Sequence, residues 1–481
     1  MSEFKKLSRN SFFSFLSTFF RLFANVILFW LIARYYGKEI FGQFTIAQTF
    51  AAMFVLFADF GLDILLTTEL PKNLKPSNEL FRKLFSIKLV LSILSFIGMA
   101  ILAFVGNFGT QVRHLIIIFS FYAAFTTLTN FLFAFFRGNE KFEYETRVSF
   151  LINFGALIII FVLILFKESI IVISLAFAII RLFGLIVSVF YVLQVQSDIT
   201  FKLDFDNPSA ILKQVLIFGV FLIFGNLYFQ LDTILLSFWT SEESVGIYQA
   251  VFRLILLPLL VSDVLVSSFM PTLSRLNSEN LEKWKTTGFL LNKFLIIISL
   301  PISIAIYFFA DQLISIIYGK SEYAEAVPIL KIFAIIVFVR LISETRGLML
   351  TTSNRQKTRM LIVVSATIIN LCINIILIPI FSIRGAAIAS LVTNLFVCIS
   401  FFYFTMGYTH NWNKIFSNPL LIIVVVTFSA LLWLFNILEV WYLSFIQFIL
   451  YFVFAFNKLL TDTEKQYFLE IKFIKNFSVI K

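Results

Sequence analysis

The chain has 481 residues, of which 60% are hydrophobic and 14% are charged, and its formal net charge is +11. Soluble domains are about 45–50% apolar and about 25% charged, so this composition excludes a soluble globular protein and indicates a multi-pass protein of the lipid bilayer. In such a protein the positions of the basic residues matter more than their sum, and we expect no nucleic-acid partner.

Apolar runs of about 20 residues, long enough to cross a bilayer as a helix, recur along the whole chain. The first run follows a basic N-terminal tail but exceeds the roughly 7–15 apolar residues of a signal peptide, so we expect it to be retained. The runs fall near residues 13–33, 43–67, 85–105, 115–136, 148–166, 169–193, 213–238, 247–270, 288–310, 325–350, 358–381, 385–408, 418–437 and 440–457. The sequence therefore predicts an all-α polytopic membrane protein with about 14 transmembrane helices.

The loops between these runs carry their basic residues unevenly. If the N-terminus lies in the cytoplasm, the tails and loops on that side hold 26 Lys and Arg residues, and those on the opposite side hold six. Of the 26, five are assigned to a loop around residues 69–88, which includes Lys88, and three to a loop at residues 137–147. Cytoplasmic loops of membrane proteins show such an excess. We therefore predict that both termini are cytoplasmic.

A short polar elbow at residues 34–47 separates the first two apolar runs, and a similar elbow returns near the middle of the chain. A shift of 204 residues aligns Gly42 with Gly246, and the same shift aligns Glu39 with Glu243. Both elbows lead into a further apolar run. The repeat predicts that the chain is built from two similar halves.

The boundary between these halves is predicted in the loop at residues 194–212, which separates the sixth and seventh apolar runs. Two pseudo-symmetric six-helix bundles would then surround a central cavity. The predicted domains are an N-lobe with helices 1–6 at residues 1–200, a C-lobe with helices 7–12 at residues 201–410, and helices 13–14 with a basic cytoplasmic tail at residues 411–481.

Sequence signatures of enzymes are scarce. The two histidines, His114 and His410, lie at the edges of apolar runs, which leaves little for a metal site or a catalytic triad. No glycine-rich phosphate-binding loop is present, and no loop between runs reaches 25 residues. We expect neither an enzyme nor a bound cofactor. Because ATP hydrolysis within the chain is not expected, uphill transport would draw on an ion gradient or on downstream consumption of the product.

Once the 32 Lys and Arg residues assigned to the tails and loops are subtracted, six of the 38 remain inside the apolar runs. A charge there costs roughly 2.5–3.5 kcal/mol at the helix centre and should therefore face a bundle interior or a wet cavity. Arg21 and Arg181 have no acid within their own runs, whereas Arg340 and Glu344 have the spacing of an intrahelical ion pair. Arginine suits a phosphate because its planar fork binds two oxygens. The candidates for a cationic, substrate-binding cavity are Arg21, Arg181, Arg253, Lys331, Arg340 and Arg346.

Acidic residues are fewer inside the apolar runs. The candidates are Asp59, Asp232, Asp263 and Glu344, with Asp63 near the end of a run. A buried carboxylate beside cationic groups is able to bind and release a proton or Na⁺, as in coupled carriers, or to hold helices together as a salt bridge. The sequence leaves these two roles open, and it leaves open which ion would be coupled.

Eight segments resemble, in order, those of Wzx-type polysaccharide flippases of the multidrug/oligosaccharidyl-lipid/polysaccharide exporter superfamily. They span roughly residues 10–410. They are L-I-A-R-Y-Y-G-K-E-I-F-G-Q-F in the first elbow, D-F-G-L at Asp59–Leu62, F-F-R-G-N-E-K-F at Phe135–Phe142, D-T-I-L-L at Asp232–Leu236, V-G-I-Y-Q-A at Val245–Ala250, F-M-P-T-L-S-R-L at Phe269–Leu276, I-Y-G-K-S-E-Y-A-E-A-V-P-I-L at Ile317–Leu330 and L-I-P-I-F-S-I-R-G-A-A-I-A-S at Leu377–Ser390.

The resemblance implies that the two bundles move an undecaprenyl-pyrophosphate-linked oligosaccharide, such as an O-antigen repeat unit, from the cytoplasmic to the periplasmic leaflet of the bacterial inner membrane. Alternating access of the lobes would drive the step, with the polymerase and chain-length proteins of the pathway as partners. A lipid II flippase fits the helix number and basic interior equally well. A multidrug cation exporter fits less well because its cavity should be acidic, and a polymerase or ligase would need a large external loop.

Overall fold

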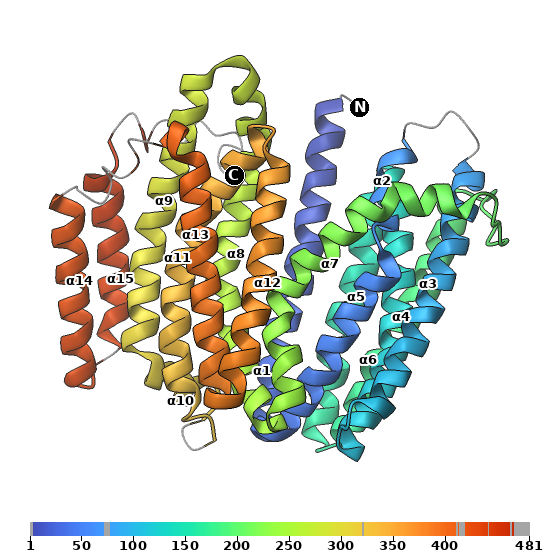
Figure 1. The fold of residues 1–481 in the computed structure, drawn as a ribbon, viewed down its shortest axis with the longest axis horizontal. Coiled ribbons are helices and arrows are strands. Elements are labelled where there is room, and N and C mark those ends of the chain that lie inside the picture. The colour runs from blue at the N-terminus through green and yellow to red at the C-terminus, as the bar shows by residue number, and fades with distance from the viewer. Residues whose placement is uncertain are drawn as a thin grey trace. The chain divides into compact units, whose positions relative to one another are not determined.

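The structure is a computed structural model that describes residues 3–71, 77–319, 322–409, 412, 419–440, 442–461 and 464–465. Over these residues it contains helices and no strands (Figure 1). Twelve of the helices are long and apolar enough to cross a membrane. The prediction of an all-α polytopic membrane protein is therefore confirmed.

The chain divides into two compact units, Met1–Ala250 and Val251–Lys481, and each is considered by itself. The first unit contains α1 (Glu3–Asp59), α2 (Leu62–Glu69), α3 (Ser77–Val105), α4 (Thr110–Gly138), α5 (Phe142–Leu165), α6 (Ile170–Val195), α7 (Pro208–Trp239) and the start of α8 (Glu242–Glu279). The second contains the rest of α8, then α9 (Leu281–Phe308), α10 (Ala310–Ile317), α11 (Ala326–Thr352), α12 (Gln356–Phe381), α13 (Ile383–Thr409), α14 (Pro419–Ile437), α15 (Leu443–Phe454) and η2 (Ala455–Leu459). The lobe boundaries at residues 200 and 410 stay predictions.

Helix α1 holds two of the predicted membrane spans. It is interrupted at Gly37, whose φ of 73° and ψ of 176° are not helical, and glycine adopts such a conformation without a steric penalty because it lacks a Cβ. The second span stops at Phe60 and Gly61, which both have positive φ, and continues as α2. The last predicted span corresponds to the shorter apolar helix Leu443–Leu459. About 14 spans follow once the two parts of α1 and this short helix are included.

The repeated elbow forms a symmetric helix crossing inside the first unit. A Cβ added to Gly42 would overlap the carbonyl oxygen of Glu242, and one added to Gly246 would overlap that of Lys38. Lys38 and Glu242 are themselves related by the shift that aligns the two glycines, so each contact is the counterpart of the other. The crossing is reinforced by an ion pair between Lys38 and Glu243. The sequence repeat therefore corresponds to a local pseudo-twofold axis between the two glycines.

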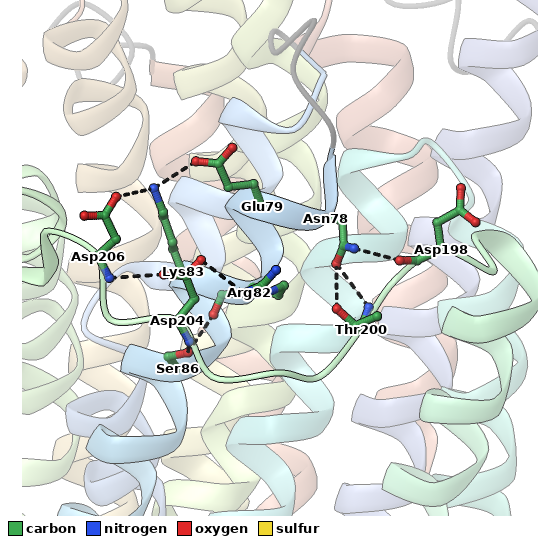
Figure 2. A network of polar contacts seen from close by, with 9 residues as sticks. All are labelled: Asn78, Glu79, Arg82, Lys83, Ser86, Asp198, Thr200, Asp204 and Asp206. Carbon is green, nitrogen blue, oxygen red and sulfur yellow. Dashed lines mark hydrogen bonds and ion pairs between the residues drawn. The ribbon is translucent and has the colours of Figure 1, made fainter.

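The segment between α6 and α7 is hydrogen-bonded to α3 at several positions (Figure 2). The sequence predicts the boundary of the two halves in this segment. The amide of Asn78 donates to the carbonyl oxygen of Asp198 at 2.7 Å, and its Oδ1 accepts from the backbone N–H of Thr200 at 3.1 Å. Further along, the backbone N–H of Asp204 donates to Oγ of Ser86 at 2.6 Å. These bonds satisfy backbone groups that have no partner within a helix or sheet, and they give the segment a defined path.

Candidate functional site

The first unit gathers arginines from three helices around one carboxylate. Arg21 of α1 lies within electrostatic range of Arg181 of α6, Arg137 of α4 and Glu145 of α5. Nη2 of Arg181 is 3.3 Å from the hydroxyl of Tyr122, and its guanidinium lies 5.2 Å from the centre of that ring. Nε of Arg137 is 2.9 Å from Oε2 of Glu145. We call these five residues the guanidinium cluster.

The guanidinium cluster has an excess of positive charge, because it contains three arginines and one carboxylate. Arg21 as a whole residue is exposed and Arg181 is half-buried. Planar guanidinium groups from different helices are able to bind several oxygens of one phosphate at once. The chemistry of the cluster therefore suits an anionic ligand with phosphate groups.

Arg137 is a member of this cluster that sequence reasoning missed. It was expected in a loop at residues 137–147, but α4 continues to Gly138 and α5 begins at Phe142. The turn between them is therefore so short that Arg137 reaches the side chain of Glu145 on the next helix. The signal available in the sequence was a basic residue at the end of one helix and an acidic residue eight positions later, at the start of the next helix.

The second unit brings together another set of charged side chains. Nε of Arg340 lies 3.8 Å from Oε1 of Glu344 on the same helix, which confirms the expected intrahelical pair. Oε2 of Glu344 also lies 3.8 Å from Arg359 of α12. Asp263 of α8 is within electrostatic range of both Arg340 and Glu344. Two carboxylates and two arginines therefore meet between α8, α11 and α12.

Arg346 occupies an aromatic environment. It is only 6% exposed, and its guanidinium lies 4.6 Å from the centre of the Phe402 ring and 5.5 Å from that of Trp412. An aromatic face attracts a cation through its quadrupole, and the attraction grows when water is excluded. This arrangement stabilises the charge of Arg346 by stacking.

The two remaining basic candidates also lie in the second unit, at separate places. Lys331 is exposed, with its ammonium 5.6 Å from the centre of the Tyr307 ring. Arg253 is half-buried and lies within electrostatic range of Tyr318. Of the six basic candidates, the structure thus brings Arg21 and Arg181 together. A cationic cavity shared by the two halves stays a prediction.

The acidic candidate Asp59 belongs to a buried triad at the break between α1 and α2. Nζ of Lys88 lies 3.0 Å from Oδ1 of Asp59 and 2.8 Å from Oδ1 of Asp63. Lys88 was expected in a loop at residues 69–88, and that expectation is wrong: α3 begins at Ser77, and the side chain of Lys88 has no exposed surface. Its two carboxylate partners lie on the preceding elements, out of reach of any local sequence window.

Asp232, another acidic candidate, is also buried in the first unit. It is 5% exposed, and its Oδ2 accepts a hydrogen bond from the hydroxyl of Tyr248 at 2.6 Å. Beside it, the amide of Gln249 donates to Oγ1 of Thr233 at 2.7 Å. These bonds join α7 to the start of α8, so Asp232 has a structural role, and its role in ion coupling stays a prediction.

The second unit contains an apolar cavity of about 610 Å³ bounded by α8, α9, α10, α11 and α15. Its lining includes Pro258, Phe309 and Phe445, with Gln312 and Ser444 as polar members. A cavity of this composition suits a hydrocarbon chain. Across the part of the chain that the structure describes, no three His, Cys, Asp or Glu residues are grouped as metal ligands.

These features together define a polytopic α-helical membrane protein with a cationic cluster in one unit and an apolar cavity in the other. The chain belongs to the family of polysaccharide biosynthesis proteins, whose model matches residues 7–277. A second family model, MatE, matches residues 217–376. The expectation of a polysaccharide-related member of the exporter superfamily is therefore confirmed.

Two curated relatives match parts of the chain. The "Probable low-salt glycan biosynthesis flippase Agl15" of Haloferax volcanii is 25% identical over 209 residues, which are 43% of this chain and 44% of that protein. The "Teichuronic acid biosynthesis protein TuaB" of Bacillus subtilis is 27% identical over 150 residues, or 30% of each chain. The matched region thus covers less than half the length of either relative.

Solved structures agree with the fold over a greater length. The lipid II flippase MurJ in an inward closed conformation has a TM-score of 0.71 and 18% identity, covering 92% of this chain and 98% of that one. A multidrug resistance MATE family transporter in an inward-facing conformation has a TM-score of 0.64 and 14% identity, covering 82% and 95%. At these identities the likeness shows a shared fold.

Proposed function

We propose that this protein is a flippase for a lipid-linked oligosaccharide of surface-polysaccharide biosynthesis. The substrate we propose is an undecaprenyl-pyrophosphate-linked repeat unit, such as an O-antigen unit, moved from the cytoplasmic to the periplasmic leaflet of the bacterial inner membrane. The polymerase and chain-length proteins of the same pathway would receive it. The observation that carries the proposal is the guanidinium cluster.

The cluster matches the chemistry of the proposed head group. A pyrophosphate presents several oxygens and more than one negative charge, and Arg21, Arg137 and Arg181 offer planar donors from three helices against the single carboxylate of Glu145. Such a head group pays a large desolvation cost when it leaves water. Guanidinium groups held by the protein would replace part of its hydration.

The remaining parts of the substrate have compatible surroundings. The prenyl chain is apolar and is able to stay in the bilayer or to enter the apolar cavity of the second unit. Both named relatives carry glycan or teichuronic acid biosynthesis in their names, which supports a glycan as the cargo. The excess of basic residues in alternate loops supports cytoplasmic termini. We further propose that alternating access moves the head group and that a proton or Na⁺ gradient drives it.

A lipid extraction tests the proposed cargo. The gene is deleted in its host, and undecaprenyl-pyrophosphate-linked oligosaccharides are quantified together with the surface polysaccharide. We expect single repeat units to accumulate and surface polymer to be lost. Unchanged lipid intermediates and unchanged surface glycan, with new sensitivity to cationic dyes, would instead favour drug export.

A variant series tests the guanidinium cluster. We expect Arg181→Ala to abolish export and Arg181→Lys to retain part of it, because lysine keeps the charge and loses the planar fork. Arg355→Ala is the matched control: the guanidinium of Arg355 lies 5.3 Å from the Tyr408 ring, much as Arg181 lies against Tyr122, but outside the cluster. Normal export with Arg181→Ala would remove this residue from the site.

A second candidate is a lipid II flippase, favoured by the structural likeness to MurJ. A lipid II head group also carries a pyrophosphate, so the guanidinium cluster suits both. The same extraction separates them, because the deletion would then accumulate lipid II and leave the oligosaccharide intermediates unchanged.

A further inference from the structure

The break between α1 and α2 is built around buried charges. Asp59 is the last residue of α1, Phe60 and Gly61 have φ values of 46° and 88°, and Asp63 lies in the first turn of α2. The backbone N–H of Asp63 donates to Oδ1 of Asp59 at 3.1 Å. Lys88 of α3 reaches into this break and bridges the two carboxylates. Positive φ is uncommon for a non-glycine residue such as Phe60, so contacts with the surrounding structure must stabilise this backbone conformation.

The charges of the triad do not balance. Two carboxylates and one ammonium leave one negative charge when all three groups are ionised. Lys88 has no exposed surface, and the side chains of Asp59 and Asp63 are 14% and 17% exposed. Burying an uncompensated charge costs several kcal/mol. Binding one proton removes that charge.

The hydrogen bonds indicate which carboxylate carries the proton. Oδ1 of Asp59 accepts from both Lys88 and the backbone N–H of Asp63, and donors of this kind favour the ionised form of a carboxyl group. Asp63 accepts from Lys88 through Oδ1. Asp63 is therefore the better place for a proton. Protonating it would leave Lys88 paired with Asp59 and would weaken the link between α2 and α3.

Among the residues that the structure describes, no further charged side chain contacts the triad. From α4 the facing group is the Phe131 ring, whose centre lies 5.9 Å from Nζ of Lys88. From α7, Gly219 packs against Phe60 so closely that a Cβ would lie 2.8 Å from the carbonyl oxygen of that residue. The other ionisable side chains on α1, α2, α3, α4 and α7 that the structure describes are Arg21, Arg34, Tyr35, Tyr36, Lys38, Glu39, Glu69, Glu79, Arg82, Lys83, Arg113, His114, Tyr122, Arg137, Lys213, Tyr228 and Asp232.

These other groups are engaged or placed elsewhere. Arg82 and Lys83 face the segment between α6 and α7, Arg137 pairs with Glu145, and Asp232 bonds to Tyr248. Lys213 and His114 are exposed. Arg113 lies 18 residues from Phe131 along α4, or about 27 Å at 1.5 Å per residue. The charged partners of Asp59, Asp63 and Lys88 are thus the other members of the triad.

We propose that the Asp59–Lys88–Asp63 triad is a binding site for one exchangeable proton, carried by Asp63, in which the ammonium of Lys88 occupies the place between the carboxylates that Na⁺ would need. The proton passes between water and one Asp63 oxygen, and the net charge of the triad changes from −1 to 0. The proposed site specifies which ion would be coupled in the proposed function. Only the use of this proton in transport rests on that function. The site itself is defined by the three side chains.

Infrared spectroscopy on the purified full-length protein, with ¹³C-labelled aspartate, tests the site directly. We expect the carbonyl band of a protonated aspartate that disappears reversibly as pH rises, with the same titration in NaCl and in choline chloride. Asp63→Asn should remove this band. The matched control is Asp206→Asn. Asp206 is an exposed carboxylate that pairs with Lys83, and Lys83 lies on the same helix, α3, as Lys88, so this change should leave the band intact.

Several outcomes would overturn the proposal: no such band in the wild type, a band that survives Asp63→Asn, or a band displaced by Na⁺. Failure of Asp63→Asn to fold would also contradict it, because the neutral side chain imitates the protonated state. Lys88→Gln is a second variant, and it should shift the titration to higher pH because the remaining carboxylates then share the proton without a counter-charge. The infrared measurement does not depend on a glycan substrate. If gene deletion leaves the lipid-linked intermediates unchanged while the band is still observed, the proposed flippase function is rejected and the proton site is supported.

Discussion

Two lysines on α3 make nearly the same contacts in different surroundings. Lys83 and Lys88 each bridge two carboxylates, and the four distances between Nζ and oxygen are 2.9 Å to Glu79, 2.8 Å to Asp206, 3.0 Å to Asp59 and 2.8 Å to Asp63. The side chain of Lys83 is 20% exposed and its partner Asp206 is 72% exposed, whereas Lys88 is completely buried. Distance alone therefore does not separate these two bridges.

The two lysine bridges differ in how far they are exposed to solvent. An ion pair in water gains little, because both charges are well hydrated when apart and salt screens them when together. A buried pair has already lost its hydration, so removing one partner leaves a charge that nothing compensates. We infer that the bridge of Lys83 guides the segment between α6 and α7, while that of Lys88 is required for the fold of the break between α1 and α2.

The largest effect is expected for Lys88→Met. This change leaves the carboxylates of Asp59 and Asp63 buried beside each other, and breaking a buried pair costs about 3–5 kcal/mol. Unfolding of the purified protein, followed by circular dichroism during denaturant titration, measures the loss. Lys83→Met is the control on the same helix and should lower the unfolding midpoint far less than Lys88→Met, because its ion pairs are exposed. Equal effects of the two changes would show that burial does not decide their importance.

A neutral version of the triad should recover much of that stability. Lys88→Gln combined with Asp59→Asn and Asp63→Asn removes all three charges and keeps side chains of similar size that are able to hydrogen-bond. Replacing a whole buried ionic group is often far less costly than removing one member. We expect the triple variant to unfold at a clearly higher denaturant concentration than Lys88→Met. A triple variant as unstable as the single one would point to lost packing rather than to uncompensated charge.

The fold was largely predictable because its main determinants are local. Membrane spans follow from the length and polarity of single stretches, and the repeat of Gly42 and Gly246 follows from comparing two short stretches. The structure adds the reason for that repeat, since each glycine leaves room for a backbone carbonyl of the other copy. The intrahelical pair of Arg340 and Glu344 was predictable on the same grounds.

The candidate sites were less predictable because their members meet through tertiary packing. Lys88 lies in a stretch rich in basic residues and reads as part of a loop, and the carboxylates that explain its burial lie 25 and 29 residues earlier. Arg137 likewise reads as a loop residue until the short turn after α4 brings Glu145 to it. From the local sequence alone, such a charged residue is assigned to an exposed loop. Its place in the interior becomes clear only when its partner, which is distant in the sequence, is known.

A smaller effect is expected for Ser86→Ala, between the two lysines on α3. Oγ of Ser86 accepts from the backbone N–H of Asp204 at 2.6 Å and donates to the carbonyl oxygen of Arg82 at 2.8 Å, in a fully buried position. Losing such a bond costs about 1–3 kcal/mol when its partner stays buried. We expect a loss near the lower end, with faster amide exchange at Asp204 measured by mass spectrometry. Unchanged exchange there would mean that the segment is held by its other contacts.

The smallest effect is a pH dependence of the exposed bridge. Hydrogen bonding to Lys83 and the attraction of its charge hold the pKa of Asp206 below its ordinary value of about 3.9. A carboxyl group whose pKa is lower in the folded state contributes stability above its unfolded pKa, and that contribution is lost as pH falls through the folded pKa. Asp206→Asn should therefore be slightly less stable than the wild type at neutral pH, and the difference should vanish in acid and in high salt. A difference that persists in acid would mean that the charge of Asp206 does not account for its contribution, and the contrast with Lys88 would then have to rest on burial of the ammonium alone.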